Sequence, residues 1–155
     1  MKKQILLITT LIILVSCSTS VQKNDTAQIT IPIQGTWKLL TGTLIEKGDT
    51  TITDYTKDKE FIKIINDTHF AFLTHDLNKG KDSAAIFSAG GGNYTLKDSL
   101  YIEHLQYCND RQWEGNNFEF TVTINNDTLI QKGLEKIDSL GVNRMNIEKY
   151  LRVKD

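Results

Sequence analysis

Hydrophobic and polar residues alternate over short stretches of this chain, with the period of two that is typical of half-buried β-strands. Residues 118–124 are the clearest case, because every even position is apolar and every odd position is polar. From residue 35 onward, such stretches predict strands over Trp37–Glu46, Ile52–Tyr55, Phe61–Ile65, His69–Thr74, Ser83–Ala89, Asn93–Leu96, Leu100–Tyr107, Phe118–Ile124, Thr128–Gln131 and Met145–Arg152.

Turn-forming residues separate these stretches, as in Gly48-Asp49, Asn66-Asp67, Lys97-Asp98 and Asn125-Asn126-Asp127. Short turns make strands that are consecutive in sequence neighbours in the sheet, so the chain predicts a long meander. The best helix candidate, Leu134–Leu140, could equally be a loop, and nothing longer is available to cover a sheet. Closure removes the exposed edges, so we predict an all-β fold: one antiparallel up-and-down barrel of about 8–10 strands.

The N-terminal segment has the features of an export signal. Lys2 and Lys3 precede an apolar run from Ile5 to Val15, which is shorter than the roughly 20 residues that a membrane-spanning helix needs. The run ends in Leu14-Val15-Ser16-Cys17, which resembles the bacterial lipobox. The resemblance implies cleavage after Ser16 and lipidation of Cys17; the alternative is an ordinary signal peptide with a chance cysteine.

These features divide the chain of 155 residues into a signal peptide (1–16), a lipidated flexible tether (17–33) and one barrel domain (34–155). We expect a cell-envelope protein that is anchored to the membrane through its N-terminal lipid. No acidic cluster follows Cys17, so we expect the anchor to face the periplasm. With Cys17 lipidated, Cys108 would have no partner for a disulfide, because the chain has two cysteines.

The formal net charge of −1 provides no basic surface for nucleic acid, and we expect none to bind. The composition is that of a globular domain, with 39% hydrophobic and 24% charged residues.

Several short motifs resemble the calycin superfamily, which contains the lipocalins. Gly35-Thr36-Trp37 resembles the Gly-x-Trp that opens those barrels, and Arg152 matches the arginine of the last strand that covers this tryptophan. More narrowly, the chain is similar to lipocalin-like domains of uncharacterised bacterial lipoproteins, in the segments Lys63–Phe70, Gly90–Thr95 and Tyr101–His104. The resemblance implies a fold, not an activity. One departure is that residues 47–51 are too few for the helical lid of fatty-acid-binding proteins, which implies an open mouth or a smaller cavity.

A ligand-recognition set is predicted around Glu103, which would share a strand face with Tyr107 and would lie beside Tyr94 across a hairpin. Arg111 and Trp113 lie in a polar loop that could cover the mouth. A carboxylate among aromatic rings can bind the polar end of a ligand, but the same residues could instead form a purely structural hydrogen-bonded network.

Other motifs favour structural interpretations. Gly90-Gly91-Gly92 lacks the lysine and helix start of a phosphate loop, so a bulge or sharp bend is favoured. The histidines have no tight metal-ligand spacing, and His104 and Cys108 would lie about 13 Å apart along one strand. We therefore predict no catalytic residues, no metal and no cofactor.

The leading functional hypothesis is a lipid-anchored barrel that binds a small, largely apolar ligand with one polar end. The alternative is a structural or adaptor lipoprotein, with a filled barrel and a surface that contacts an envelope protein. An enzyme acting on envelope material ranks last, since no nucleophile–base pair is apparent.

Overall fold

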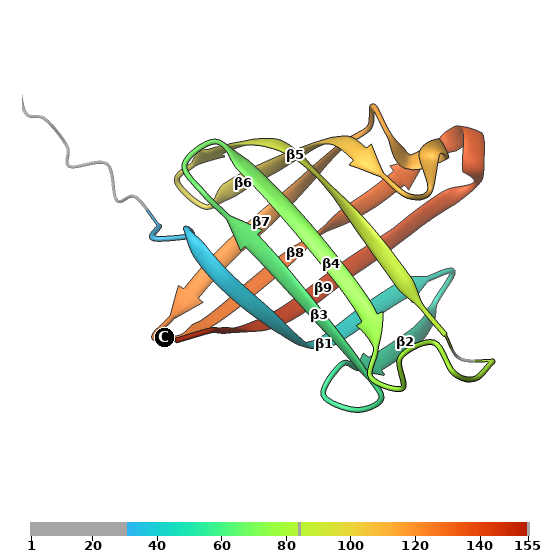
Figure 1. Ribbon diagram of the computed structural model, residues 1–155. Helices are drawn as coiled ribbons and strands as arrows, with labels where there is room; N and C mark the ends of the chain where they lie inside the picture. Colours follow the sequence, from blue (N-terminus) through green and yellow to red (C-terminus); the bar gives the residue numbers. More distant parts are fainter. Residues whose placement is uncertain (1–30, 84, 155) are drawn as a thin grey trace, which may run out of the picture.

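The computed structural model describes residues 31–83 and 85–154 and contains almost only β-structure in them (Figure 1). Signal peptide 1–16, Cys17 and most of the predicted tether lie outside the described residues. The strands are β1 (Gly35–Glu46), β2 (Asp49–Asp54), β3 (Lys59–Ile65), β4 (His69–Asp76), β5 (Phe87–Lys97), β6 (Leu100–Cys108), β7 (Asn117–Asn125), β8 (Thr128–Ile137) and β9 (Val142–Arg152). Two 3₁₀ turns, η1 (Arg111–Trp113) and η2 (Asp138–Leu140), complete the elements.

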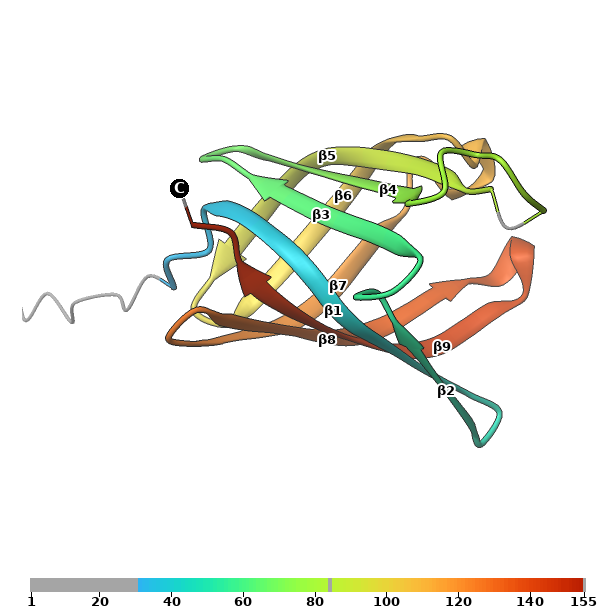
Figure 2. The ribbon, with the colours of Figure 1, turned by 60° about the horizontal axis from the view of Figure 1, so that its bottom comes forward.

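The sheet closes on itself. Strands β3 to β9 pair antiparallel in sequence order, β1 pairs with β3, and β1 also pairs with β9 from Trp37↔Arg152 to Ile45↔Met145. These pairings make an eight-stranded barrel, and β2 is an additional strand beside the second half of β1 (Figure 2). The predicted all-β, antiparallel up-and-down barrel is therefore confirmed.

Two of the predicted element boundaries are wrong. The stretch expected over 93–96 and the end of the one expected over 83–89 belong to one strand, β5, which begins at Phe87, because the chain stays extended through Gly90-Gly91-Gly92. The favoured bulge is present there: Gly91 is opposite Tyr107, Gly92 is opposite Leu105, and the intervening Gln106 has no partner. At 134–140, strand β8 continues to Ile137, and only the short turn η2 follows before Gly141, whose φ of 66° reverses the chain.

One end of the barrel is closed by packed side chains. Trp37 and Ile33 are fully buried there, and the Trp37 indole donates a hydrogen bond of 2.8 Å to the Ile33 carbonyl. Arg152 lies over Trp37, with 4.0 Å between the guanidinium carbon and the ring centroid, and donates to the carbonyls of Pro32 and Gln34. Residues 31–33, predicted as tether, thus pack against the barrel, because Ile33 plugs its end.

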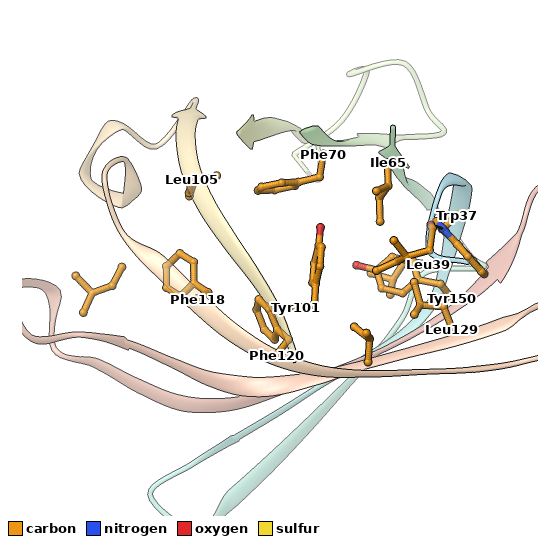
Figure 3. Close-up of a cluster of buried hydrophobic side chains, with 13 residues drawn as sticks. Trp37, Leu39, Ile65, Phe70, Tyr101, Leu105, Phe118, Phe120, Leu129 and Tyr150 are labelled. Carbon is orange, nitrogen blue, oxygen red and sulfur yellow. Dashed lines mark hydrogen bonds between the residues drawn. The ribbon is translucent and has the colours of Figure 1, made fainter. Parts of the chain in front are cut away.

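Part of the core lies in this half of the barrel, and the rest, including Leu105, Phe118 and Phe120, extends towards the other end. Figure 3 shows Leu39, Leu129 and Tyr150 gathered beside Trp37, with the Tyr101 ring pointing into the interior. The loops that carry η1 and η2 lie at the opposite end (Figure 1). Within the described residues, no helix is long and apolar enough to cross a membrane.

We predict that Gly92→Ala destabilises the barrel, because a Cβ atom at this position would overlap the carbonyl oxygen of His104 across the bulge. The free energy of unfolding in urea should fall by about 1–3 kcal/mol. Gly42→Ala in β1 is the control, since its Cβ would meet only the edge of the Tyr55 ring at 3.2 Å. An equal loss in the two variants would contradict this role of Gly92.

Candidate functional site

A cavity of about 300 Å³ occupies the half of the barrel opposite Trp37. Five aromatic residues, Leu105 and Cys108 form the apolar part of its wall, and nine polar residues, six of them charged, form the rest; Asp110 and Ser88 lie at its rim. The lining residues are Phe61, Lys63, Phe72, Ser88, Glu103, Leu105, Cys108, Asp110, Trp113, Phe118, Phe120, Gln131, Glu135, Arg144, Asn146 and Glu148.

Strand alternation directs the polar residues of the lining inward. In β8, buried and more exposed positions alternate from Leu129 to Ile137, so Gln131 and Glu135 share the inner face with the apolar residues between which they occur. In β3, Lys63 shares the inner face with Phe61 and Ile65 for the same reason. Closure of the sheet then places side chains from β3, β6, β8 and β9 around one space.

A buried ion pair lies at the inner end of the cavity. The Lys63 ammonium is 2.7 Å from Glu103, donates to Gln131 at 3.1 Å and is 3.8 Å from Glu148. Glu148 in turn accepts a hydrogen bond of 2.9 Å from the Tyr150 hydroxyl. The side chains of Lys63 and Glu103 are only 3% and 9% exposed, so water contributes little to their solvation.

Burial and neighbouring charges shift the pKa values of this pair. Burial raises the pKa of Glu103, and the contact with Lys63 offsets this only in part. Burial acts to lower the pKa of Lys63, but the carboxylates of Glu103 and Glu148 more than offset it and raise that pKa above its ordinary value. Lys63 therefore stays charged, while Glu103 takes up a proton more readily than an exposed glutamate does.

A second polar cluster lies nearer the mouth. Glu135 accepts hydrogen bonds of 2.7 Å from Arg144 on one carboxylate oxygen and from Asn146 on the other. The Arg144 guanidinium carbon lies 5.3 Å from the centroid of the Trp113 ring, which places a cation against an aromatic face. Trp113 packs on Phe118 at a centroid distance of 5.9 Å, so η1 forms part of the wall.

Two residues of the predicted recognition set line the cavity, namely Glu103 and Trp113. Tyr94 does not, although it is opposite Glu103 in the β5–β6 pairing. Its hydroxyl donates to the Asn66 carbonyl at 2.8 Å, and its ring packs against Tyr101.

The expectation that Tyr107 shares a face with Glu103 is wrong. The bulge at Gln106 inverts the alternation of β6, so Tyr107 points outward and is 68% exposed. Arg111 also lies outside the cavity, where it pairs with Glu114 at 2.8 Å. Both residues border a shallow apolar hollow on the outer face of β4 and β5.

Sequence reasoning missed most of the polar lining, including Lys63, Gln131, Glu135, Arg144, Asn146 and Glu148. The sequence pattern could have indicated some of these residues. Lys63 is the single charged residue within Phe61–Ile65, and Gln131 and Glu135 share every second position with Leu129, Gly133 and Ile137. For Arg144 and Glu148, the β9 sequence offers no comparable contrast between faces.

The histidines of the described chain are not grouped with Cys108 at the cavity. His69, His75 and His104 all lie outside the cavity lining, and no group of three or more histidine, cysteine or acidic side chains in the described ranges could hold a metal. Cys108 lines the cavity, whereas His104 bonds Asn117 at 2.7 Å, so this cysteine and histidine do not act together. Burial raises the pKa of the Cys108 thiol, which disfavours the nucleophilic thiolate.

No protein-family model matches the sequence, and no curated protein matches it either. The arrangement itself is suited to recognition, because it combines apolar walls with a few fixed charges and hydrogen-bonding groups.

We predict that Glu103 makes stability depend on pH. Its pKa is raised on folding, so its ionisation opposes folding above the ordinary value of 4.5, and that penalty disappears as the pH falls to this value. Glu103→Gln should remove this component, so the wild type should gain stability relative to the variant on acidification, as measured by urea unfolding across pH. Glu119→Gln, on the exposed outer face of β7, is the control: the difference in free energy of unfolding between this variant and the wild type should vary less with pH. A constant difference for Glu103→Gln would contradict the raised pKa.

Proposed function

We propose that this chain is a binding protein of the calycin type, whose barrel holds a small, largely apolar molecule with one polar end. The observation that carries the proposal is the cavity of about 300 Å³, at the lower end of the range of roughly 300–1,000 Å³ found for small-molecule sites. Its walls include the stacked rings of Phe61 and Phe72. Its interior charged groups are held largely by one another, as in the pairs of Lys63 with Glu103 and of Arg144 with Glu135.

The cost of burying charge supports this proposal over an adaptor with a filled barrel. Replacing a buried ion pair with apolar residues is often neutral or stabilising, so the pair of Lys63 and Glu103 is weak evidence for a purely structural role. A cavity that keeps such groups at its wall can use them to orient a ligand. The stacking of Arg152 on Trp37, which is what the calycin resemblance implies, supports the choice of class.

We also propose that lipidation of Cys17 anchors the protein to a membrane of the cell envelope, with the barrel facing the periplasm. The chain enters the barrel at the closed end, where Arg152 binds the carbonyl of Pro32, and the cavity opens at the opposite end. This arrangement supports a mouth directed away from the anchored end and free to receive a ligand.

For the cavity, we predict saturable one-to-one binding of 1-octanol, measured by titration calorimetry and by the fluorescence of Trp113. Ser88→Trp should weaken binding about tenfold or more, because a ring in the mouth displaces ligand methylenes that are each worth about 0.8 kcal/mol. Thr95→Trp is the control, since Thr95 lies on the exposed face of the same strand. If the wild type shows no saturable binding, or both variants bind equally well, the proposed function is wrong.

For the anchor, we predict that the protein expressed in a bacterium begins at Cys17 and carries acyl chains, which intact-mass analysis would detect. Cys17→Ala should remain uncleaved by the lipoprotein peptidase and unlipidated, because the acylated thiol is lost. A mature wild-type protein without added acyl mass would overturn the proposed anchor and leave the cavity proposal untouched.

A further inference from the structure

The charges in the cavity wall do not balance. Three glutamates line its interior, Glu103, Glu135 and Glu148, and Asp110 adds an exposed carboxylate at the rim, against two cations, from Lys63 and Arg144. With all six groups ionised, the lining carries an excess of two negative charges, one of them at the rim. In a space with low-dielectric walls, such an excess attracts cations more strongly than it would in water.

The pairing within the wall identifies the carboxylate that is left over. Glu135 is satisfied on both oxygens by Arg144 and Asn146, and Glu103 is paired with Lys63 at 2.7 Å. Glu148 is the interior carboxylate that is least compensated by a cation, because its Oε2 atom is 3.8 Å from the Lys63 ammonium.

The second carboxylate oxygen of Glu148, Oε1, can accept a further hydrogen bond. The Tyr150 hydroxyl and the nearby ammonium of Lys63 both contact Oε2. For Oε1, the described part of the chain provides no hydrogen bond, and the side chain is 15% exposed. A carboxylate oxygen in this state can accept a further charge-assisted hydrogen bond.

The aromatic walls are compatible with a cationic ligand. Phe61, Phe72, Trp113, Phe118 and Phe120 present rings to the cavity, and the faces of such rings attract cations. Trp113 already lies against the Arg144 cation, which shows that this site accommodates such a contact.

We infer that the cavity selects ligands with a single positive charge, an ammonium group on a small apolar body, and that Glu148 is the anionic partner of this group. The inference rests on the proposed function, because it names the polar end of the ligand. An anionic ligand would meet Arg144 only at the cost of proximity to the three interior glutamates.

The test compares three probes with the same alkyl chain, octylammonium, 1-octanol and octanoate, titrated calorimetrically at neutral pH. We expect octylammonium to bind about tenfold more tightly than octanol, the gain from one charge-assisted hydrogen bond, and octanoate to bind more weakly than octanol. Equal or weaker binding of octylammonium, with octanol still bound, would overturn the charge selectivity and leave the binding proposal standing. Failure of all three probes would overturn both.

Two variants test whether the preference for a positively charged ligand depends on Glu148. Glu148→Gln keeps the shape of the side chain and an acceptor for Tyr150, and should reduce the ratio of octylammonium to octanol affinity to about one. Glu119→Gln removes the same charge from the outer face and should leave the ratio unchanged. If the ratio of octylammonium to octanol affinity is unchanged in Glu148→Gln, Glu148 is not the anionic partner of the ammonium group. If that variant folds poorly, the comparison of the three probes on the wild-type protein still decides the selectivity.

Discussion

Pairing of the first strand with the last is the interaction on which the rest of the structure depends. Strand β1 pairs with β9 along nearly its whole length, while its other edge is divided between β3 and β2. Without this closure the inner faces of the strands would be exposed to water, and Lys63 would be solvated rather than paired across the barrel with Glu103. Closure therefore creates both the core and the unusual electrostatics of the interior.

The enclosed space is divided into a filled half and a hollow half. At the filled end, Trp37, Ile33 and Arg152 combine packing, hydrogen bonding and cation–π stacking, so the end of the barrel and the incoming chain are one unit. At the hollow end, the strands carry inward phenylalanines interspersed with charged residues, and the wall is completed by Trp113 of η1. The boundary between the halves is the ion pair of Lys63 and Glu103, which is expensive to bury and whose ammonium also contacts Gln131 and Glu148.

The position of the charges bears on function more than their number does. Exposed ion pairs such as Lys154 with Asp127 contribute little to stability, because water screens them. The charges in the cavity lie among aromatic rings, and the neighbouring groups fix their geometry. Under the proposed function, selectivity comes from this fixed set and not from a single reactive side chain.

Local sequence pattern determined the class of fold. Alternation in stretches such as Phe118–Ile124, together with asparagine and glycine turns, was enough to predict consecutive antiparallel strands and a closed barrel. It could not determine which polar residues meet, because Lys63, Glu103 and Glu148 are far apart in the chain and come together only through closure. Nor could it show that Tyr107 faces outward, since one unpaired residue at a bulge inverts the faces of a strand. The fold follows from periodicity that is written locally, whereas the site follows from register and bulges, which are set by pairing between distant strands.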